Sequence, residues 1–264
     1  MGYLKVAAVL LASTSLALDA APATAQALAR PVRYSAEDFY DTTSFGMGSP
    51  AGYGFSADGR SIVISSDSSG VFNTYALPVT GGAPVAVTNS PDNATFAASY
   101  FPKDDRVLFT ADKGGNELDH VYVRAADGTV RDLTPGEKVK ADFIGWSADG
   151  ETFWVTSNER NPEMFDIYAY DTDDYERRIV FQNDGYNVGG ISRDGRYVAL
   201  VKERTSADND LYLVDLKASS PAPKHLTQHE GNVTYGVYDF TPDSRALVYA
   251  TNEAGEWNQA WRYD

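Results

Sequence analysis

A four-residue pattern, Ser-x-Asp-Gly or a close variant of it, recurs five times along this chain between apolar runs. Its clearest copy is Ser147-Ala148-Asp149-Gly150, which joins the runs 143–146 and 152–156. Asp-Gly between two such runs is a strong signal for a hairpin with a type I′ turn, because both central residues need positive φ. The five aspartates are Asp58, Asp104, Asp149, Asp194 and Asp243, at spacings of 46, 45, 45 and 49 residues. The spacing predicts five consecutive hairpins of one kind, with altered turns where Asp105 and Ser244 replace the glycine.

A second feature repeats in register with the first. Each copy carries an aromatic residue 17 to 19 positions after its aspartate: Tyr75, Tyr122, Tyr168, Tyr212 and Trp261. A period near 45 is typical of β-propeller blades, which have four strands in about 40–50 residues. Continuous apolar runs such as 197–201 indicate strands covered on both faces, whereas a two-sheet sandwich would alternate more strictly. The predicted fold is therefore all-β, a propeller segment of four-stranded blades.

The N-terminus indicates export. A short basic start, an apolar run at 6–18 and small residues with A-x-A spacing predict a signal peptide over residues 1–27. The apolar run is too short to span a bilayer, so we expect a periplasmic or secreted protein without membrane attachment after cleavage. Residues 28–50 are predicted as a lead-in segment, in which Ser35 and Asp38 resemble a helix-capping box.

Residues 51–264 are predicted as a partial propeller of four complete blades and part of a fifth. The fifth copy has no sequence for an outer strand, so the chain resembles the N-terminal part of a longer protein. An unpaired sheet edge is a template for pairing with another chain, so self-association through this edge is a further expectation.

Composition excludes several classes of function. The chain has 37 Asp plus Glu against 22 Lys plus Arg, a formal net charge of −15, which disfavours nucleic-acid binding. It has no cysteine, so disulfides, thiolate metal sites and thiol nucleophiles are excluded. His225 and His229 flank a short strand end, and a structural role is expected for them. Asp142 and Asp239 are the only carboxylates near inner strands. A glycosidase needs an acid and a base that face one sugar, and neither aspartate has a recognisable partner for this role.

Two longer stretches carry a resemblance to a known family. They are Asp112-Lys113-Gly114-Gly115-Asn116-Glu117-Leu118-Asp119-His120-Val121-Tyr122 and Asn158-Glu159-Arg160-Asn161-Pro162-Glu163-Met164-Phe165-Asp166-Ile167-Tyr168. With the lead-in 35–40, the chain resembles the propeller half of an exported prolyl oligopeptidase family serine peptidase, nearest to the dipeptidyl and acylaminoacyl peptidases. The corner pattern is also shared with TolB-like and WD40-like repeats.

The resemblance implies a propeller of seven or eight blades that caps a C-terminal α/β-hydrolase domain with a Ser-Asp-His triad. It implies peptide substrates, a gating and filtering role for the propeller, and no metal or organic cofactor. The nucleophile motif G-x-S-x-G of such hydrolases does not occur in the chain. Residues 46–50, Gly-Met-Gly-Ser-Pro, have the serine at the wrong offset and no strand-to-helix context, so no catalytic residue is assigned.

Exopeptidases of this family hold the free amine of the substrate with propeller carboxylates. The resemblance therefore implies Glu117, Glu159 and Glu163 as substrate-binding candidates, with Arg160 as a contact for a carbonyl or carboxylate group. The alternative is a stand-alone TolB-like propeller that binds a periplasmic protein without catalysis. Sequence beyond residue 264 would separate the two hypotheses.

Overall fold

The computed structural model describes residues 32–264. The predicted signal peptide, residues 1–27, lies outside the described residues. The chain divides between Thr42 and Thr43 into two compact units. No helix in the described part is long and apolar enough to cross a membrane.

The first unit contributes one short helix, α1 (Ala36–Tyr40). The Ser35 hydroxyl accepts a hydrogen bond from the Asp38 amide (3.3 Å), and Asp38 Oδ2 accepts one from the Ser35 amide (2.6 Å). These reciprocal bonds satisfy amides that have no partner inside the first turn of a helix. The capping box predicted from Ser35 and Asp38 is confirmed.

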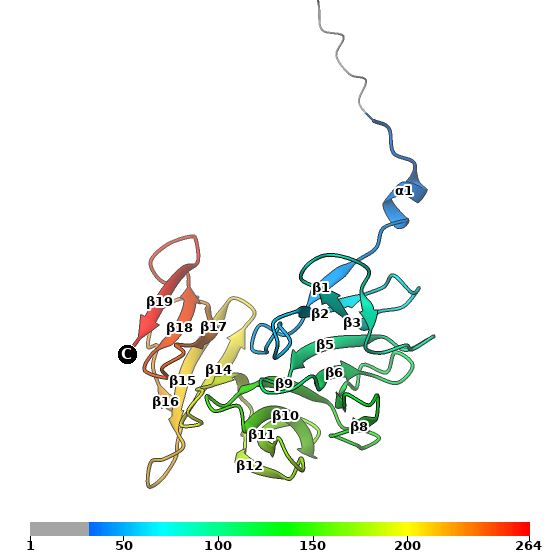
Figure 1. The fold of residues 1–264 in the computed structure, drawn as a ribbon. Coiled ribbons are helices and arrows are strands. Elements are labelled where there is room, and N and C mark those ends of the chain that lie inside the picture. The colour runs from blue at the N-terminus through cyan, green and yellow to red at the C-terminus, as the bar shows by residue number, and fades with distance from the viewer. Residues whose placement is uncertain (1–31) are drawn as a thin grey trace, which may run out of the picture. The chain divides into compact units, whose positions relative to one another are not determined.

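The second unit consists of five antiparallel sheets in which the order of strands follows the chain (Figure 1). The first sheet comprises β1 (Phe45–Met47), β2 (Ser61–Ser66), β3 (Asn73–Pro78) and β4 (Val85–Ala86). The second comprises β5 (Thr95–Tyr100), β6 (Val107–Ala111), β7 (His120–Arg124) and β8 (Val130–Asp132). The third comprises β9 (Ala141–Trp146), β10 (Thr152–Asn161), β11 (Met164–Asp171) and β12 (Arg177–Phe181).

The fourth sheet comprises β13 (Asn187–Ile191), β14 (Tyr197–Thr205), β15 (Asp208–Asp215) and β16 (Lys224–His225). The fifth has three strands, β17 (Tyr235–Phe240), β18 (Leu247–Thr251) and β19 (Gln259–Tyr263). Four four-stranded sheets and one three-stranded sheet confirm the predicted propeller segment.

Apolar clusters fill the spaces between successive sheets. Leu108 and Phe153 are fully buried between the second and third sheets, where the Phe101 and Phe153 ring centroids lie 5.9 Å apart. Between the third and fourth sheets, Trp154 packs with Val198. The second strand of a sheet is thus covered on both faces, as its continuous apolar sequence predicts.

The first sheet begins inside the segment 28–50. Strand β1 pairs with β2, with Phe45 opposite Ser66. Between β1 and the first corner the chain forms only isolated bridges, from Phe55 to Ile62 and from Tyr53 to Tyr100. This interrupted strand lets residues 48–54 cross to the second sheet.

The corners between first and second strands are not the predicted type I′ turns. Gly150 has φ +72°, but Asp149 does not have the positive φ that a type I′ turn requires. The Gly150 amide donates to the Ser147 carbonyl (3.0 Å), as in a type I turn followed by a left-handed residue. The Asp149 side chain stabilises this turn, because its Oδ1 accepts hydrogen bonds from the Ser147 hydroxyl (2.6 Å) and the Glu151 amide (3.0 Å).

The same hydrogen bonds recur in the first, fourth and fifth corners. In the fifth, Thr241 replaces serine and donates to Asp243 Oδ1 (2.6 Å), and Ser244 takes the glycine position at φ +58°. The prediction of a different turn at Ser244 is therefore wrong. The second corner does differ, because Pro102 has no amide hydrogen and the pairing bond moves to the Phe101 amide, which donates to the Arg106 carbonyl (2.8 Å).

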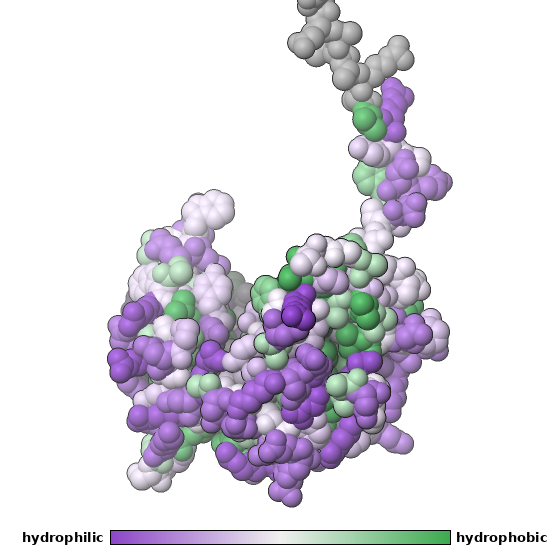
Figure 2. Space-filling view, viewed as in Figure 1, coloured by the Kyte–Doolittle hydropathy of each residue, from purple (hydrophilic) through white to green (hydrophobic). Residues whose placement is uncertain are grey.

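Polar side chains cover most of the face shown in Figure 2, in keeping with the strongly acidic composition. Apolar side chains show mainly over the first sheet in this view. Phe45 and Met47 of β1 are 64% and 65% exposed, so this sheet presents apolar surface that no described residue covers.

Candidate functional site

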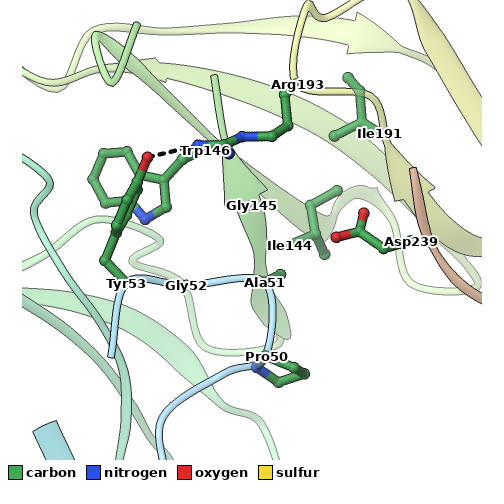
Figure 3. Close-up of a pocket in the computed structure, with 10 residues that line it drawn as sticks. All are labelled: Pro50, Ala51, Gly52, Tyr53, Ile144, Gly145, Trp146, Ile191, Arg193 and Asp239. Carbon is green, nitrogen blue, oxygen red and sulfur yellow. Dashed lines mark hydrogen bonds between the residues drawn. The ribbon is translucent and has the colours of Figure 1, made fainter. Parts of the chain in front are cut away.

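A cavity of about 150 Å³ lies within the second unit, where the first strands of the sheets converge (Figure 3). It is named the axial pocket here. Its lining residues are Pro50, Ala51, Gly52, Tyr53, Ile144, Gly145, Trp146, Ile191, Arg193 and Asp239. The first, third, fourth and fifth sheets or their connections therefore all contribute to one cavity.

β-Bulges shape the strands around the axial pocket. In each of β5, β9, β13 and β17 one residue is skipped in the pairing register: Ala98, Ile144, Gly189 and Tyr238. A bulge bends a strand and re-aims side chains locally. In β9 this places Ile144 against the pocket, beside Gly145 and Trp146, which would alternate in a regular strand. The sequence analysis did not predict these bulges.

The loop 48–54 closes the pocket on the side of the first sheet. The Ser49 amide donates to the Ala98 carbonyl (2.8 Å), and the Tyr100 amide donates to the Tyr53 carbonyl (2.8 Å). A Cβ atom on Gly52 would lie 2.6 Å from the Ala98 oxygen, so only glycine allows this approach. Ser49 thus lies in a loop held against β5 and not on a strand-to-helix turn, consistent with its exclusion as a nucleophile.

Ser99 and Tyr53 connect the sheets around the pocket by hydrogen bonds. Ser99 Oγ accepts from the Trp146 indole and from the Tyr53 amide, both at 2.8 Å. The Tyr53 hydroxyl accepts from the Arg193 guanidinium (2.6 Å), which reaches it from the fourth corner. Residues 140 positions apart are thereby joined across the axis, and the aromatic wall of the pocket is fixed.

The predicted substrate-binding residues lie at the other end of the blades. Corners and second-to-third strand loops are at opposite ends of a second strand, and the ten residues of β10 span about 30 Å. Glu159 and Arg160 lie near the end of β10, Glu163 lies in the turn that follows it, and Glu117 lies in the loop between β6 and β7. The structure thus brings Glu117, Glu159, Arg160 and Glu163 to one end of adjacent sheets.

Two of these four side chains have partners within the chain. Glu159 accepts a hydrogen bond from Arg177 Nη2 (2.7 Å), and its Oε2 lies 2.6 Å from Arg177 Nη1 in an ion pair. Arg160 donates to the fully buried Asp166 (2.5 and 2.8 Å) and to the Asn183 carbonyl (3.0 Å). The carboxylates of Glu117 and Glu163 are exposed and form no ion pair with any described residue. The two free carboxylates are therefore better placed to receive a ligand than the other two side chains.

In each of the first four sheets, the first buried residue of the third strand is polar and contacts the connection that follows its sheet. In the first three sheets it is Asn73, His120 or Asp166. His120 lies between Asp132 Oδ2 (2.7 Å) and the Gly136 carbonyl (3.0 Å). The repeat gives these residues a structural role in joining neighbouring sheets.

In the fourth sheet this residue is Asp210, which both His225 and His229 approach. Asp210 Oδ1 lies 2.9 Å from His225 Nε2 and 3.4 Å from His229 Nε2. Both histidines reach it because β16 is only two residues long. No group of three or more His, Asp or Glu side chains in residues 32–264 is arranged to hold a metal ion.

Asp142 and Asp239 do not share a site. Asp239 lines the axial pocket and Asp142 does not. Asp142 reaches solvent, but desolvation by the surrounding strands raises the pKa of its carboxyl group. A glycosidase needs an acid and a base that face one sugar, so this arrangement gives that hypothesis no support.

Comparison with known proteins gives a consistent result. The family model described as prolyl oligopeptidase, N-terminal beta-propeller domain, matches residues 88–259. Dipeptidyl aminopeptidase BIII of Pseudoxanthomonas mexicana is 31% identical over 169 residues, which are 62% of this chain. The match covers 24% of that relative, so the chain spans about a quarter of its length.

Solved structures agree with this architecture. Prolyl oligopeptidase B from Galerina marginata has a TM-score of 0.59 at 13% identity, over 80% of this chain and 31% of its own. A protein of Agrobacterium tumefaciens, described as a TolB candidate, has a TM-score of 0.51 at 20% identity, over 84% of this chain and 77% of its own. At these identities the likeness is one of fold alone.

Proposed function

Because the chain belongs to the N-terminal β-propeller domain family of the prolyl oligopeptidases, we propose that it is the propeller part of an exported serine peptidase. In this proposal the propeller gates and filters peptide substrates. The catalytic nucleophile belongs to an α/β-hydrolase domain outside these 264 residues.

The observation that carries the proposal is the family match over residues 88–259, which runs from the connection before β5 into β19. The relative with the name dipeptidyl aminopeptidase supports an exopeptidase, an enzyme that must recognise a free N-terminus. The predicted signal peptide at 1–27 supports delivery to the periplasm or the medium. The reading frame that encodes the chain should then continue past Asp264 into further blades and a G-x-S-x-G motif. A stand-alone TolB-like propeller would instead lack that motif.

The positions of the loop side chains suggest which residues would bind the free amine of a peptide. Glu117 and Glu163 offer carboxylates that no residue of 32–264 pairs with, at one end of adjacent sheets, and an ammonium group is their natural partner. Glu159 and Arg160 support this end of the third sheet through Arg177 and Asp166. We assign amine binding to Glu117 and Glu163 and a supporting role to Glu159 and Arg160.

Peptide binding tests the proposal on the chain itself. A fluorescent tetrapeptide with a free N-terminus should bind more tightly than the same peptide acetylated at its N-terminus. Glu163→Gln should remove that preference, while Glu176→Gln, an exposed carboxylate at the other end of the third sheet, should preserve it. Equal binding of both peptides by the unaltered chain would refute amine recognition.

Catalysis gives a second test. The chain should not hydrolyse dipeptide chromogenic amides, because Ser49 lies in a loop held against β5. Turnover that Ser49→Ala abolishes would identify an active site within these residues. Turnover that survives repurification and Ser49→Ala would equally contradict the assignment of the nucleophile to another domain.

A further inference from the structure

The axial pocket contains a cation and an anion that no described side chain neutralises. Arg193 is half-buried, and its guanidinium donates within the described chain only to the Tyr53 hydroxyl. A guanidinium has five N–H donors, so most of them remain available. Asp239 accepts one hydrogen bond, from the Phe240 amide (2.7 Å), and forms no ion pair in residues 32–264.

Both side chains are directed at the cavity. In Figure 3 the Arg193 side chain runs past Gly145 toward Tyr53, and the Asp239 carboxylate faces Ile144. Several other arginines of this acidic chain have carboxylate partners, including the neighbouring Arg196, which binds Asp215 at 2.7 Å. A partly buried guanidinium without a counterion has lost hydration that a charge-assisted hydrogen bond would replace. The pocket is therefore suited to an anionic group from outside the chain.

The rest of the lining limits the size and character of the ligand. Ile144, Ile191 and Pro50 form an apolar wall, and Tyr53 can still donate its hydroxyl hydrogen. The volume of about 150 Å³ corresponds to roughly five waters at about 30 Å³ each. That space accommodates a single amino acid or a very small dipeptide.

We propose that the axial pocket binds a short aliphatic zwitterion, a free amino acid or small dipeptide. The α-carboxylate of this ligand binds Arg193 and the Tyr53 hydroxyl. Its ammonium group binds Asp239, and its side chain packs against Ile144 and Ile191. The pocket is at the corner end of the blades, away from Glu117 and Glu163. The inference therefore goes beyond the proposed function and does not depend on it.

Titration of the purified chain with L-valine, followed by NMR, tests this site. The Trp146 indole N–H should shift saturably, with a dissociation constant on the order of 1 mM for so small a ligand. L-valinamide lacks the carboxylate and N-acetyl-L-valine lacks the ammonium group. Each should bind about tenfold more weakly or worse, because one charge-assisted contact is lost.

Matched variants locate the contacts. Arg193→Gln and Asp239→Asn should each weaken L-valine binding about tenfold. Arg196→Gln and Asp92→Asn change the net charge equally outside the pocket and should leave binding unchanged. Asp239 is exposed and makes only one local hydrogen bond, so its variant tests the site even if Arg193→Gln impairs folding. No shift of Trp146 at saturating L-valine, or equal affinity for L-valinamide, would overturn the proposal.

Discussion

At the scale of single residues, the corner pattern combines a serine or threonine hydroxyl, an aspartate two positions later and a left-handed residue after it. Four of the five corners keep all three parts, with Gly59, Gly150, Gly195 or Ser244 at positive φ. The hydroxyl also accepts from the first amide of the second strand, as Ser147 does from Thr152 (2.9 Å). The corner is thus a closed set of local hydrogen bonds.

Gly150 and Gly59 offer a matched pair for measuring the cost of a side chain at this position. Both have φ near +70°, but a Cβ atom on Gly150 would lie 2.7 Å from Pro102 Cγ of the second sheet, whereas Gly59 has open space. Gly59→Ala should cost about 1–2 kcal/mol of unfolding free energy through backbone strain alone. Gly150→Ala should cost about 1–3 kcal/mol more because of overpacking against proline. Urea denaturation of both variants measures the difference, and equal costs would contradict the contact with Pro102.

The corner aspartates predict a dependence of stability on pH. The Ser147 hydroxyl and the Glu151 amide hold the pKa of Asp149 below its ordinary value. A lowered folded-state pKa gives stability that is present above the unfolded pKa of about 3.9 and is lost as pH falls through the folded value. Asp149→Asn should therefore be less stable than the unaltered chain at about pH 6, and the difference should shrink toward about pH 3. A difference in urea midpoint that stays constant with pH would exclude this linkage.

At the scale of strands and loops, the third sheet shows how a residue predicted for ligand binding serves the fold. Arg160 binds Asp166, which is fully buried at the start of β11 and also accepts from the Asn183 amide (2.8 Å). These contacts join β10, β11 and the connection to the fourth sheet. The carboxylate would be buried without a counterion if the arginine were removed.

Arg160→Ala should accordingly destabilise the chain, because it leaves the buried Asp166 carboxylate without its counterion. Adding Asp166→Asn should recover part of this loss, because an amide needs no counterion and can still accept from Asn183. Urea denaturation of the two single variants and of the double variant gives the coupling free energy between Arg160 and Asp166. If Arg160 instead served only a ligand, the single variant would be as stable as the unaltered chain.

The elements also show how far the sequence could predict this structure. The five corners were predictable because Ser147, Asp149 and Gly150 act within one turn, although the turn type was not. The bulges were not predictable, because Ala98, Ile144, Gly189 and Tyr238 share no residue type and a bulge depends on the pairing between strands. The axial pocket was missed for a similar reason, since the bond from Arg193 to Tyr53 joins residues 140 positions apart.

At the scale of the whole molecule, the first and fifth sheets each have a neighbour on one side within the described residues. The fifth sheet has three strands, and aromatic side chains around it are exposed: Tyr238 at 65%, Trp257 at 78% and Trp261 at 37%. Its middle strand is better covered than these residues, with Leu247 at 1%. Exposed aromatic groups beside an edge strand favour association with another chain.

Amide hydrogen exchange should distinguish the sheets of the isolated chain. Residues after about 232 should exchange faster than β10 and β11, because local opening costs least where few neighbours cover the backbone. Concentration-dependent self-association would protect β19 instead, and analytical ultracentrifugation would detect it. Uniform protection through Tyr263 in a strict monomer would contradict the expected weakness of this edge.

The sequential order of strands has a kinetic consequence. Within residues 32–264 each sheet pairs only strands that are neighbours along the chain, and the pairing that links two sheets is the isolated bridge between Tyr53 and Tyr100. Contacts that are close in sequence form early because they need little loop-closure entropy. A chain that emerges from a ribosome or a translocation pore can therefore complete the strand pairings of one blade before the next arrives. Contacts such as that between Tyr53 and Arg193, which need four sheets in place, belong to the last stage of assembly.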